Sequence, residues 1–293
     1  MASPAVNGLA LIAALALCTA VPIAQAAPAP ELAPVSPWNV HYAEESCKLI
    51  RGFGTTGDTV TMMIEMFGPG DRGSVVLVGN RLRSDTTFQQ VRVWFGADRP
   101  ANATEAVSAT GGSSNVPMVI ASHIWTGRAD EGVWGAEPDL AYEKSLDRVT
   151  YEAAGHVRFV LDTGRMDQPL TAMRKCVDGL VKEWGLDPAV QRTLTRRVVP
   201  ATPPQTWIHD GDYPYVPLVD GASGIVHFRL NVGVDGIPTA CVIQSKTKPD
   251  EFAPTTCRLL TTRARFQPAR DAQGQPVASY FFSSVRYANR GRG

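Results

Sequence analysis

A run of alternating apolar and polar residues near the end of the chain constrains the fold more than any other feature. The apolar members are Val226, Phe228, Leu230 and Val232, and the polar members are His227, Arg229 and Asn231. A period of two is typical of a β-strand with one buried face. Turn residues occupy 233–236 and an extended pattern resumes at 237–245, so we expect a β-hairpin.

A helix and a final strand are expected after this hairpin. Asp250 and Pro254 stand where a helix would begin, and its apolar face would consist of Ala253, Cys257, Leu260 and Ala264. A turn at 273–276 separates that helix from an extended segment at 277–287. The order strand–strand–helix–strand predicts a small domain in which the helix covers one face of a three-stranded antiparallel sheet.

The longer N-terminal part is predicted to be mostly β and to end in helices. Alternating or β-branched segments occur at 60–67, 75–78, 91–95 and 157–161, whereas the polar stretch 97–115 is expected to be a surface loop. Apolar residues then recur at three- and four-residue steps, which is the spacing of a buried helix face. The fold class expected for the whole chain is therefore α+β.

Two proline-rich stretches divide the chain. Residues 27–37 contain four prolines and are predicted to form an extended arm. Residues 198–205 contain three prolines and are predicted to form a linker. These boundaries define an α+β domain at 38–197 and a second domain at 206–288.

The beginning of the chain is typical of an export signal. Residues 9–21 form an apolar run without a charge, and Ala24-Gln25-Ala26 has the small–x–small form of a cleavage site. We therefore expect residues 1–26 to be a cleaved signal peptide and the mature protein to be periplasmic, without a stable membrane span. The alternative is a retained N-terminal helix that anchors the protein in the inner membrane, facing the periplasm.

Cleavage would leave four cysteines, and an even number in an exported chain indicates disulfides. The four are Cys47, Cys176, Cys241 and Cys257. They allow three pairings. The predicted layout favours Cys47–Cys176, from the first strands of the N-terminal domain to its last helices, together with Cys241–Cys257, from the hairpin to the helix after it. Metal binding is the rival hypothesis, but the sequence has no C-x-x-C pair and no adjacent His with ligand spacing. No metal site is predicted.

Charge and motifs argue against several classes of function. The chain carries 28 Lys+Arg and 28 Asp+Glu, so it has no basic surplus for binding nucleic acid. The sequence contains no G-x-S-x-G, H-E-x-x-H or G-x-x-x-x-G-K-[ST] motif. We therefore expect no enzyme activity, no catalytic residues and no cofactor. The alternative is a secreted enzyme whose activity resides in residues 38–197.

The C-terminal domain contains a series of short segments with a characteristic order and spacing. They are Tyr213-Pro214, Gly-Ile-Val-His-Phe-Arg at 224–229, Val-Asp-Gly at 234–236, Cys241, Thr-Cys-Arg-Leu-Leu at 256–260, Ala-Arg-Phe-Gln-Pro-Ala-Arg-Asp at 264–271, Gly274 and Pro276. Through these segments, residues 207–287 resemble the TonB C-terminal domain family. The resemblance implies a β-β-α-β fold. In the energy transducers of that family, this domain binds outer-membrane receptors.

The resemblance also implies how a partner binds. In the family, a short receptor peptide pairs with the exposed edge of the last strand, so that backbone groups supply affinity and alternate side chains supply selectivity. Here that edge is expected at 279–286. The partner-binding residues expected on it are Ser279, Phe281, Phe282, Ser284 and Arg286.

The hypothesis that follows is a periplasmic protein that binds a cell-envelope partner by edge-strand addition. The expected partner is a protein or peptide, with outer-membrane receptors among the candidates. The alternative is a TonB-type energy transducer for outer-membrane transport, anchored by a retained N-terminal helix. Against this alternative, the arm at 27–37 would reach only about 36 Å when fully extended. The oligomeric state is left open.

Overall fold

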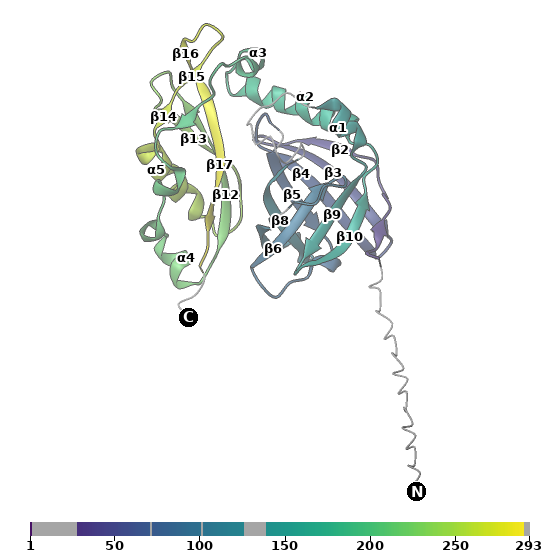
Figure 1. The fold of residues 1–293 in the computed structure, drawn as a ribbon. Helices are drawn as coiled ribbons and strands as arrows, with labels where there is room; N and C mark the ends of the chain where they lie inside the picture. Colours follow the sequence, from purple (N-terminus) through teal and green to yellow (C-terminus); the bar gives the residue numbers. More distant parts are fainter. Residues whose placement is uncertain (2–27, 71, 101, 126–138, 290–293) are drawn as a thin grey trace.

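A computed structural model describes residues 1, 28–70, 72–100, 102–125 and 139–289 of the chain. The predicted signal peptide therefore lies outside the described residues, except for Met1. The structure confirms a mixed α+β class in which strand (43%) outweighs helix (22%). Figure 1 shows two bodies side by side, a large curved sheet with helices at one end and a smaller sheet with helices on its outer face.

The large sheet has ten strands in the order β1-β10-β9-β6-β7-β8-β5-β4-β3-β2. The strands are β1 (Glu31–Leu32), β2 (Asn39–Tyr42), β3 (Cys47–Thr55), β4 (Asp58–Met66), β5 (Arg72–Val78), β6 (Phe88–Phe95), β7 (Thr104–Gly111), β8 (Val116–Trp125), β9 (Arg148–Ala153) and β10 (His156–Asp162). A short 3₁₀ helix, η1 (Asn80–Leu82), follows β5. Apart from β1 with β10, the neighbouring strands are antiparallel.

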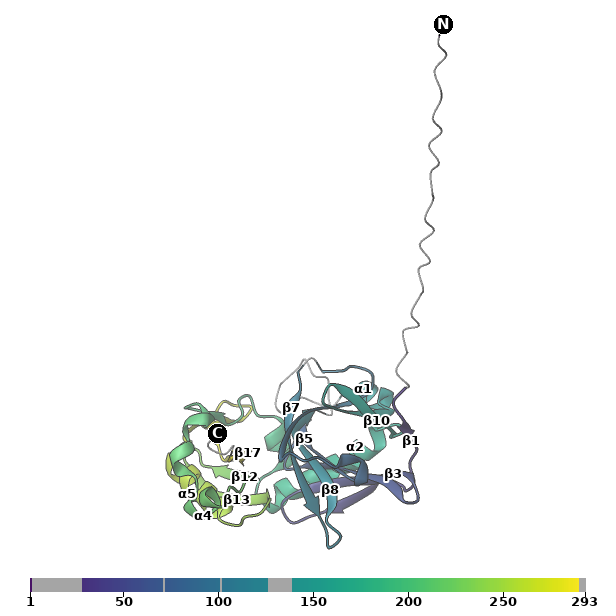
Figure 2. The ribbon, with the colours of Figure 1, turned by 90° about the horizontal axis from the view of Figure 1, so that it is seen from below.

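The segment that contains β1 closes this sheet into a barrel. Strand β1 pairs in parallel with β10, and two residues after its end the same segment pairs with β3. There the amide of Val35 donates to the carbonyl of Gly52 at 2.9 Å, and the amide of Gly54 donates to the carbonyl of Ala33 at 2.8 Å. The sheet therefore has no open gap between β10 and β3, and Figure 2 shows its strands curving around a common interior.

The segment 27–37, predicted to be an extended arm, is extended, but its central residues are paired within the barrel. The backbone of this segment is paired on both sides, and Leu32 is buried in the barrel core. Closely spaced prolines predict an unpaired segment, but they do not exclude pairing. A short strand pairs through only some of its amides, so proline is compatible with it at the other positions.

Strand β7 corrects a second prediction, the surface loop at 97–115. Small and polar residues make up most of this strand, so its sequence lacks the alternation of a half-buried strand. Pairing on both sides, with β6 and with β8, holds it in the sheet instead. Ala106 and Val107 are its buried residues.

The barrel interior is filled by apolar side chains, and a helix covers one end. Fully or almost fully buried residues include Leu49, Phe53, Met62, Ile64, Leu77, Val119, Val149, Phe159 and Leu161. Helix α1 (Leu140–Ser145) precedes β9, and helices α2 (Asp167–Glu183) and α3 (Pro188–Arg192) follow β10. Helix α2 lies across the end of the barrel (Figure 1) and buries Leu170, Met173, Cys176, Val177, Leu180 and Val181. The Cys47–Cys176 disulfide joins β3 to α2, as predicted.

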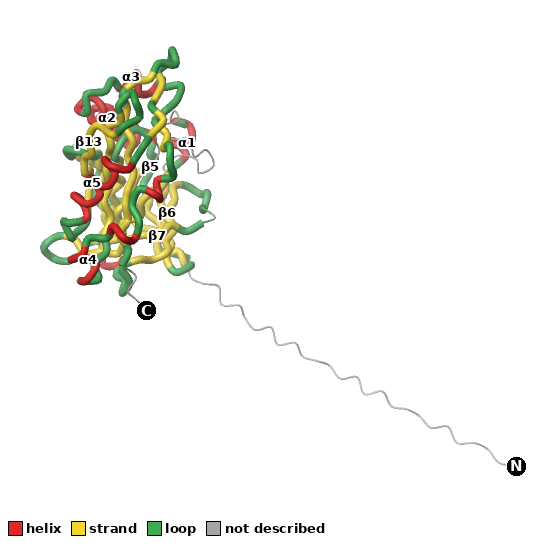
Figure 3. The backbone as a smooth tube through the Cα atoms, turned by 90° about the vertical axis from the view of Figure 1, so that its left-hand side faces the viewer, coloured by secondary structure: helices red, strands yellow, loops and turns green. Residues whose placement is uncertain are grey.

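The smaller domain is built on a three-stranded antiparallel sheet in the order β13-β12-β17. Its elements are β11 (Val199–Pro200), η2 (Pro204–Thr206), η3 (Asp210–Asp212), α4 (Tyr215–Val219), β12 (Gly224–Val232), β13 (Pro238–Lys246), α5 (Phe252–Arg263), β14 (Phe266–Gln267), β15 (Ala269–Arg270), β16 (Pro276–Val277) and β17 (Ser279–Tyr287). Figure 3 shows α5 and α4 in front of the strands, on the face away from the barrel.

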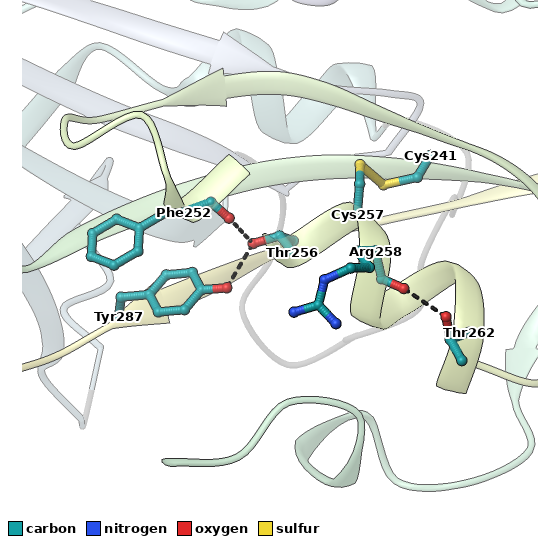
Figure 4. Close-up of a disulfide and its surroundings, with 7 residues drawn as sticks. All are labelled: Cys241, Phe252, Thr256, Cys257, Arg258, Thr262 and Tyr287. Atoms are coloured by element: carbon teal, nitrogen blue, oxygen red, sulfur yellow. Dashed lines mark hydrogen bonds between the residues drawn. A yellow bond between two sulfur atoms is a disulfide. The ribbon is translucent and has the colours of Figure 1, made fainter. Parts of the chain in front are cut away.

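Helix α5 is fixed to the sheet in two ways. The predicted Cys241–Cys257 disulfide joins it to β13 (Figure 4). One residue before Cys257 in the helix, the hydroxyls of Thr256 and Tyr287 lie 2.9 Å apart, and Thr256 also donates to the carbonyl of Phe252 at 2.8 Å. The helix is therefore joined to both outer strands of the sheet.

The proline-rich stretch at 198–205 is paired as well, which differs from the linker that its composition predicts. Strand β11 pairs with β14, and the amide of Ala201 donates to the carbonyl of Arg265 at 2.8 Å. The stretch therefore belongs to the smaller domain, and only residues before it connect the two bodies.

We predict that the two disulfides contribute unequally to stability. The chain-entropy model assigns about 5 kcal/mol to a bridge that closes a loop as long as Cys47–Cys176 and about 3 kcal/mol to Cys241–Cys257. The sequence separations are 129 and 16 residues. Urea unfolding of the two double Cys→Ser variants measures the difference. Equal losses for the two variants would show that loop length does not control the stabilisation here.

Candidate functional site

Strand β17 is an outer strand of the small sheet. Within the described residues it pairs with β12 alone. The register shows which of its backbone groups point toward β12 and which point away from it. The amide of Thr247 donates to the carbonyl of Ile225, and the amide of Gly233 donates to the carbonyl of Ile237. Odd-numbered residues of β12 therefore direct their backbone groups toward β13, and even-numbered residues direct theirs toward β17.

The same alternation applies to β17. Its residues Phe281, Ser283 and Val285 stand opposite even-numbered residues of β12, so they supply the amides and carbonyls of that ladder. The residues between them, among them Phe282 and Ser284, direct their amides and carbonyls to the outer edge. The strand thus presents a row of backbone donors and acceptors away from β12.

The barrel covers the face of the small sheet opposite α5, as Figure 2 shows. The guanidinium of Arg229 lies over the Trp184 ring at 4.3 Å, and its Nη2 is 3.1 Å from a carboxylate oxygen of Glu45. The His227 ring stacks on Phe67 with centroids 4.3 Å apart. This face is therefore closed to a partner.

A buried amide also bridges the two bodies. Gln244 Nε2 donates to the carbonyl of Phe67 at 2.7 Å and to that of Glu45 at 3.1 Å. Gly68 comes so close to Phe282 that a Cβ on it would lie 2.5 Å from the phenylalanine ring. Both contacts require close approach of the β4–β5 loop to the sheet.

The predicted partner-binding side chains are divided between the two faces of β17. The Ser279 hydroxyl donates to Gln191 Oε1 at 2.6 Å and is buried, and Phe282 packs against Phe67. Arg286 forms an ion pair with Glu105 at 2.7 Å and lies over the Phe88 ring. These three side chains are engaged within the molecule.

The other two predicted residues lie differently. Phe281 faces α5 and contacts the rings of Trp207 and Phe266, at centroid distances of 5.8 and 5.1 Å. Ser284 is half-buried near the middle of the outer edge. Most of the predicted side-chain surface of β17 is therefore engaged within the molecule or at least half-buried.

Two cavities flank this outer edge. A cavity of about 450 Å³ lies beside its second half, and one of about 260 Å³ lies beside its first half. Residues of β17 line both cavities, and Phe281 lines each of them. The segment 197–213 lines the smaller cavity with its first residues and the larger cavity with its later ones. The lining residues of that segment are Arg197, Val198, Val199, Pro200, Pro204, Gln205, Trp207, Ile208, His209, Asp210 and Tyr213. We call the two cavities together the edge groove.

The segment 197–213 forms the wall of the edge groove opposite β17, and hydrogen bonds join it to α5. Trp207 is buried, and its ring nitrogen donates to Thr202 Oγ1 at 2.8 Å. Arg263 donates to the carbonyl of Trp207 at 3.0 Å and to Asp212 Oδ1 at 2.9 Å. Pro200, Pro203 and Pro204 lack an amide hydrogen, so this wall is poorly suited to pair with β17 itself.

Sequence reasoning missed this wall. The three prolines indicated a linker, and nothing in their pattern shows what they lie against. The available signal was Trp207, a large apolar residue immediately after the prolines, which is buried far more often than exposed in small domains.

The described residues include no helix long and apolar enough to cross a bilayer. Within the same ranges, no group of three His, Cys, Asp or Glu side chains is arranged to hold a metal ion. The two disulfides are typical of an exported protein that folds outside the reducing cytoplasm.

Comparisons of the chain with protein-family profiles, with curated proteins and with solved structures find no match. The edge groove and the pairing of β17 are thus the observations on which a function can be based.

We predict that the wall of the edge groove loosens in acid. The hydrogen bonds from Arg263 lower the pKa of Asp212 from 3.8 to about 2. A lowered folded-state pKa stabilises the fold above the unfolded value, and this contribution disappears as the pH falls from about 4 to about 2. Because Arg263 is one-third exposed, we expect a contribution on the order of 1 kcal/mol at pH 7.

The measurement is urea unfolding of Asp212→Asn between pH 7 and pH 2.5. The variant should be less stable at pH 7 and should show a shallower fall in unfolding free energy below pH 4. The matched control is Asp210→Asn, because Asp210 is exposed in the same short helix. Parallel pH curves for Asp212→Asn and the unsubstituted protein would contradict the assignment.

Proposed function

We propose that this protein binds an extended peptide segment of a cell-envelope partner, which adds as a fourth strand to the outer edge of β17. The observation that carries the proposal is the edge groove. It consists of two cavities that residues of β17 line, and alternate backbone groups of that strand point away from β12. An added strand gains backbone hydrogen bonds to such an edge and places alternate side chains in the cavities on either side.

The location proposed for this binding is the periplasm. A predicted signal peptide and two disulfides support export, and the resemblance of residues 207–287 to the TonB C-terminal domain supports a partner in the envelope. The occluded sheet face adds a second constraint. Because the barrel covers that face through Arg229 and Gln244, an incoming segment would have to pair with one of the outer strands of the sheet.

The backbone register predicts which substitution prevents strand addition while leaving the domain folded. Ser284 directs its amide away from β12, so proline there removes an outward donor and leaves the β12–β17 ladder intact. Ser284→Ala is the matched control, because it shortens the same side chain and keeps the amide. We expect Ser284→Pro to weaken peptide binding about tenfold or more and Ser284→Ala to weaken it less than threefold.

The probe is a library of random twelve-residue peptides displayed on phage and selected against the mature protein, with calorimetry on the synthetic peptides that it enriches. Unchanged melting temperatures for both variants show that the fold is kept. Hydrogen exchange adds an independent measurement, since the backbone amides of β17 should exchange more slowly when a peptide is bound. Enriched peptides that bind Ser284→Pro as well as Ser284→Ala would overturn the proposal.

A further inference from the structure

Among the described residues, helix α4 carries the densest run of exposed apolar side chains. Its sequence is Tyr-Val-Pro-Leu-Val, without a charge, and Tyr215, Val216, Leu218 and Val219 are between 47% and 78% exposed. We call these four side chains the α4 patch. Single exposed apolar residues are ordinary on a soluble protein, whereas a contiguous exposed apolar patch marks an interaction site.

The geometry of the helix explains why the four side chains share one side. Successive residues of an α-helix are about 100° apart around its axis, so the α4 patch spans an arc of about 160°. Pro217 lies on the opposite side and is the buried residue of the helix. Figures 1 and 3 show α4 at one end of the smaller domain. The patch is therefore the convex outer face of a helix at the end of the molecule.

Contacts with the rest of the domain hold α4 in place. Asn289 Nδ2 donates to the carbonyl of Leu218 at 2.9 Å. Just before the helix, the Tyr213 ring packs edge-on against Phe252 and Tyr287, with centroids 5.5 Å apart in both pairs. The backbone is thus fixed by groups outside the α4 patch. A surface that is already ordered loses little conformational entropy when it binds.

Positive charge gathers at the same end of the domain. After Asn289, which contacts α4, the chain continues with Arg290 and Arg292. Lys246 and Lys248 stand at the end of β13, which pairs with the beginning of β12, the strand that follows α4. This end of the domain therefore brings basic residues from two separate parts of the chain close to α4.

Acidic residues reduce this charge without cancelling it. Asp250 forms ion pairs with both Lys246 and Lys248, so one carboxylate serves two ammonium groups. Arg258, which acts on the phenol of Tyr287, belongs to the same end. The basic residues here are Lys246, Lys248, Arg258, Arg290 and Arg292, and the acidic residues are Asp220, Asp250 and Glu251. The surroundings of the α4 patch are therefore net positive.

Size and shape favour a lipid surface over a second protein as the occupant of the α4 patch. Its exposed area is on the order of 500 Å², below the roughly 800 Å² that each partner contributes to a standard protein interface. A bilayer requires no complementary pocket, and it accepts a convex apolar face at the boundary between headgroups and acyl chains. Tyrosine is enriched at that boundary, and nearby basic residues attract anionic headgroups.

We infer that α4 docks this protein onto the surface of a lipid bilayer with anionic headgroups. The α4 patch enters the boundary between headgroups and acyl chains, and the surrounding basic residues contact the headgroups. The docking is peripheral and needs no helix that crosses the bilayer. It is also independent of the proposed strand addition, since the described residues that line the edge groove do not include any from α4.

The experiment is sedimentation of the mature protein, which lacks the apolar run at 9–21, with sucrose-loaded vesicles. Vesicles of phosphatidylethanolamine and phosphatidylglycerol are compared with neutral vesicles of phosphatidylcholine. We expect saturable binding to the anionic vesicles, about tenfold or more weaker binding to the neutral ones, and weaker binding as salt is added. Equal binding to the two kinds of vesicle, or binding to neither, would overturn the inference.

Substitutions within the α4 patch test which surface makes the contact. Leu218→Asp combined with Val219→Asp should weaken binding to the anionic vesicles about tenfold or more, because carboxylates would have to leave water. The matched control is Val234→Asp combined with Ile237→Asp. Val234 and Ile237 are exposed to a similar degree, and they lie at the β12–β13 turn, the opposite end of the small sheet. Equal losses in the two double variants would show an effect of charge alone and overturn the inference.

A milder variant guards against loss of the fold. Val216→Ser combined with Val219→Ser removes apolar surface without adding a charge, and it should weaken binding in the same direction at an unchanged melting temperature. A folded variant of this kind that binds the anionic vesicles like the unsubstituted protein would overturn the insertion of the α4 patch.

Two further measurements test the headgroup contact and the rival occupant. Arg290→Gln combined with Arg292→Gln should weaken binding to the anionic vesicles several-fold, and unchanged binding would overturn the headgroup contact. Analytical ultracentrifugation without lipid tests whether the α4 patch joins two copies of the chain. A dimer that Leu218→Asp with Val219→Asp dissociates, together with no binding to vesicles, would overturn the inference in favour of self-association.

Discussion

The arrangement of the two bodies depends on one buried guanidinium. Arg229 stacks on Trp184 of the barrel domain, and only 4% of its side chain is exposed. A buried charge without a partner costs several kcal/mol, and here Glu45 supplies the opposite charge from the other body. Separating the bodies would leave the Arg229 guanidinium and the Glu45 carboxylate without each other as partners. The contact therefore fixes which face of the sheet the barrel covers.

Much of the C-terminal domain could be predicted from the sequence, because its signals are local. The alternation at 226–232 is the period of the strand found there, and the apolar spacing around Cys257 is that of α5. Cys241 and Cys257 could be paired because the element order already places their strand and helix together. The edge position of β17 also follows from that order, since a strand after the helix can pair on only one side of the hairpin.

The sequence could not show what each surface packs against. The polar face of β12 has the composition of a solvated face, yet His227 and Arg229 are buried against Phe67 and Trp184. Prolines indicated an arm and a linker, but both stretches are paired with strands distant in the chain. Pairing between segments that are distant in the chain produces no hydrophobic periodicity by which the sequence could reveal it. The wall of the edge groove belongs to the same class of features.

The pairing of the cysteines has a consequence for how an exported chain of this kind matures. Among the four cysteines of the described residues, the first bonds to the second and the third bonds to the fourth along the sequence, Cys47 to Cys176 and Cys241 to Cys257. A chain that crosses a membrane from its N-terminus delivers its thiols to the oxidising side in that same order. Stepwise oxidation during translocation then yields the native bridges directly, and no shuffling by an isomerase is needed to reach them.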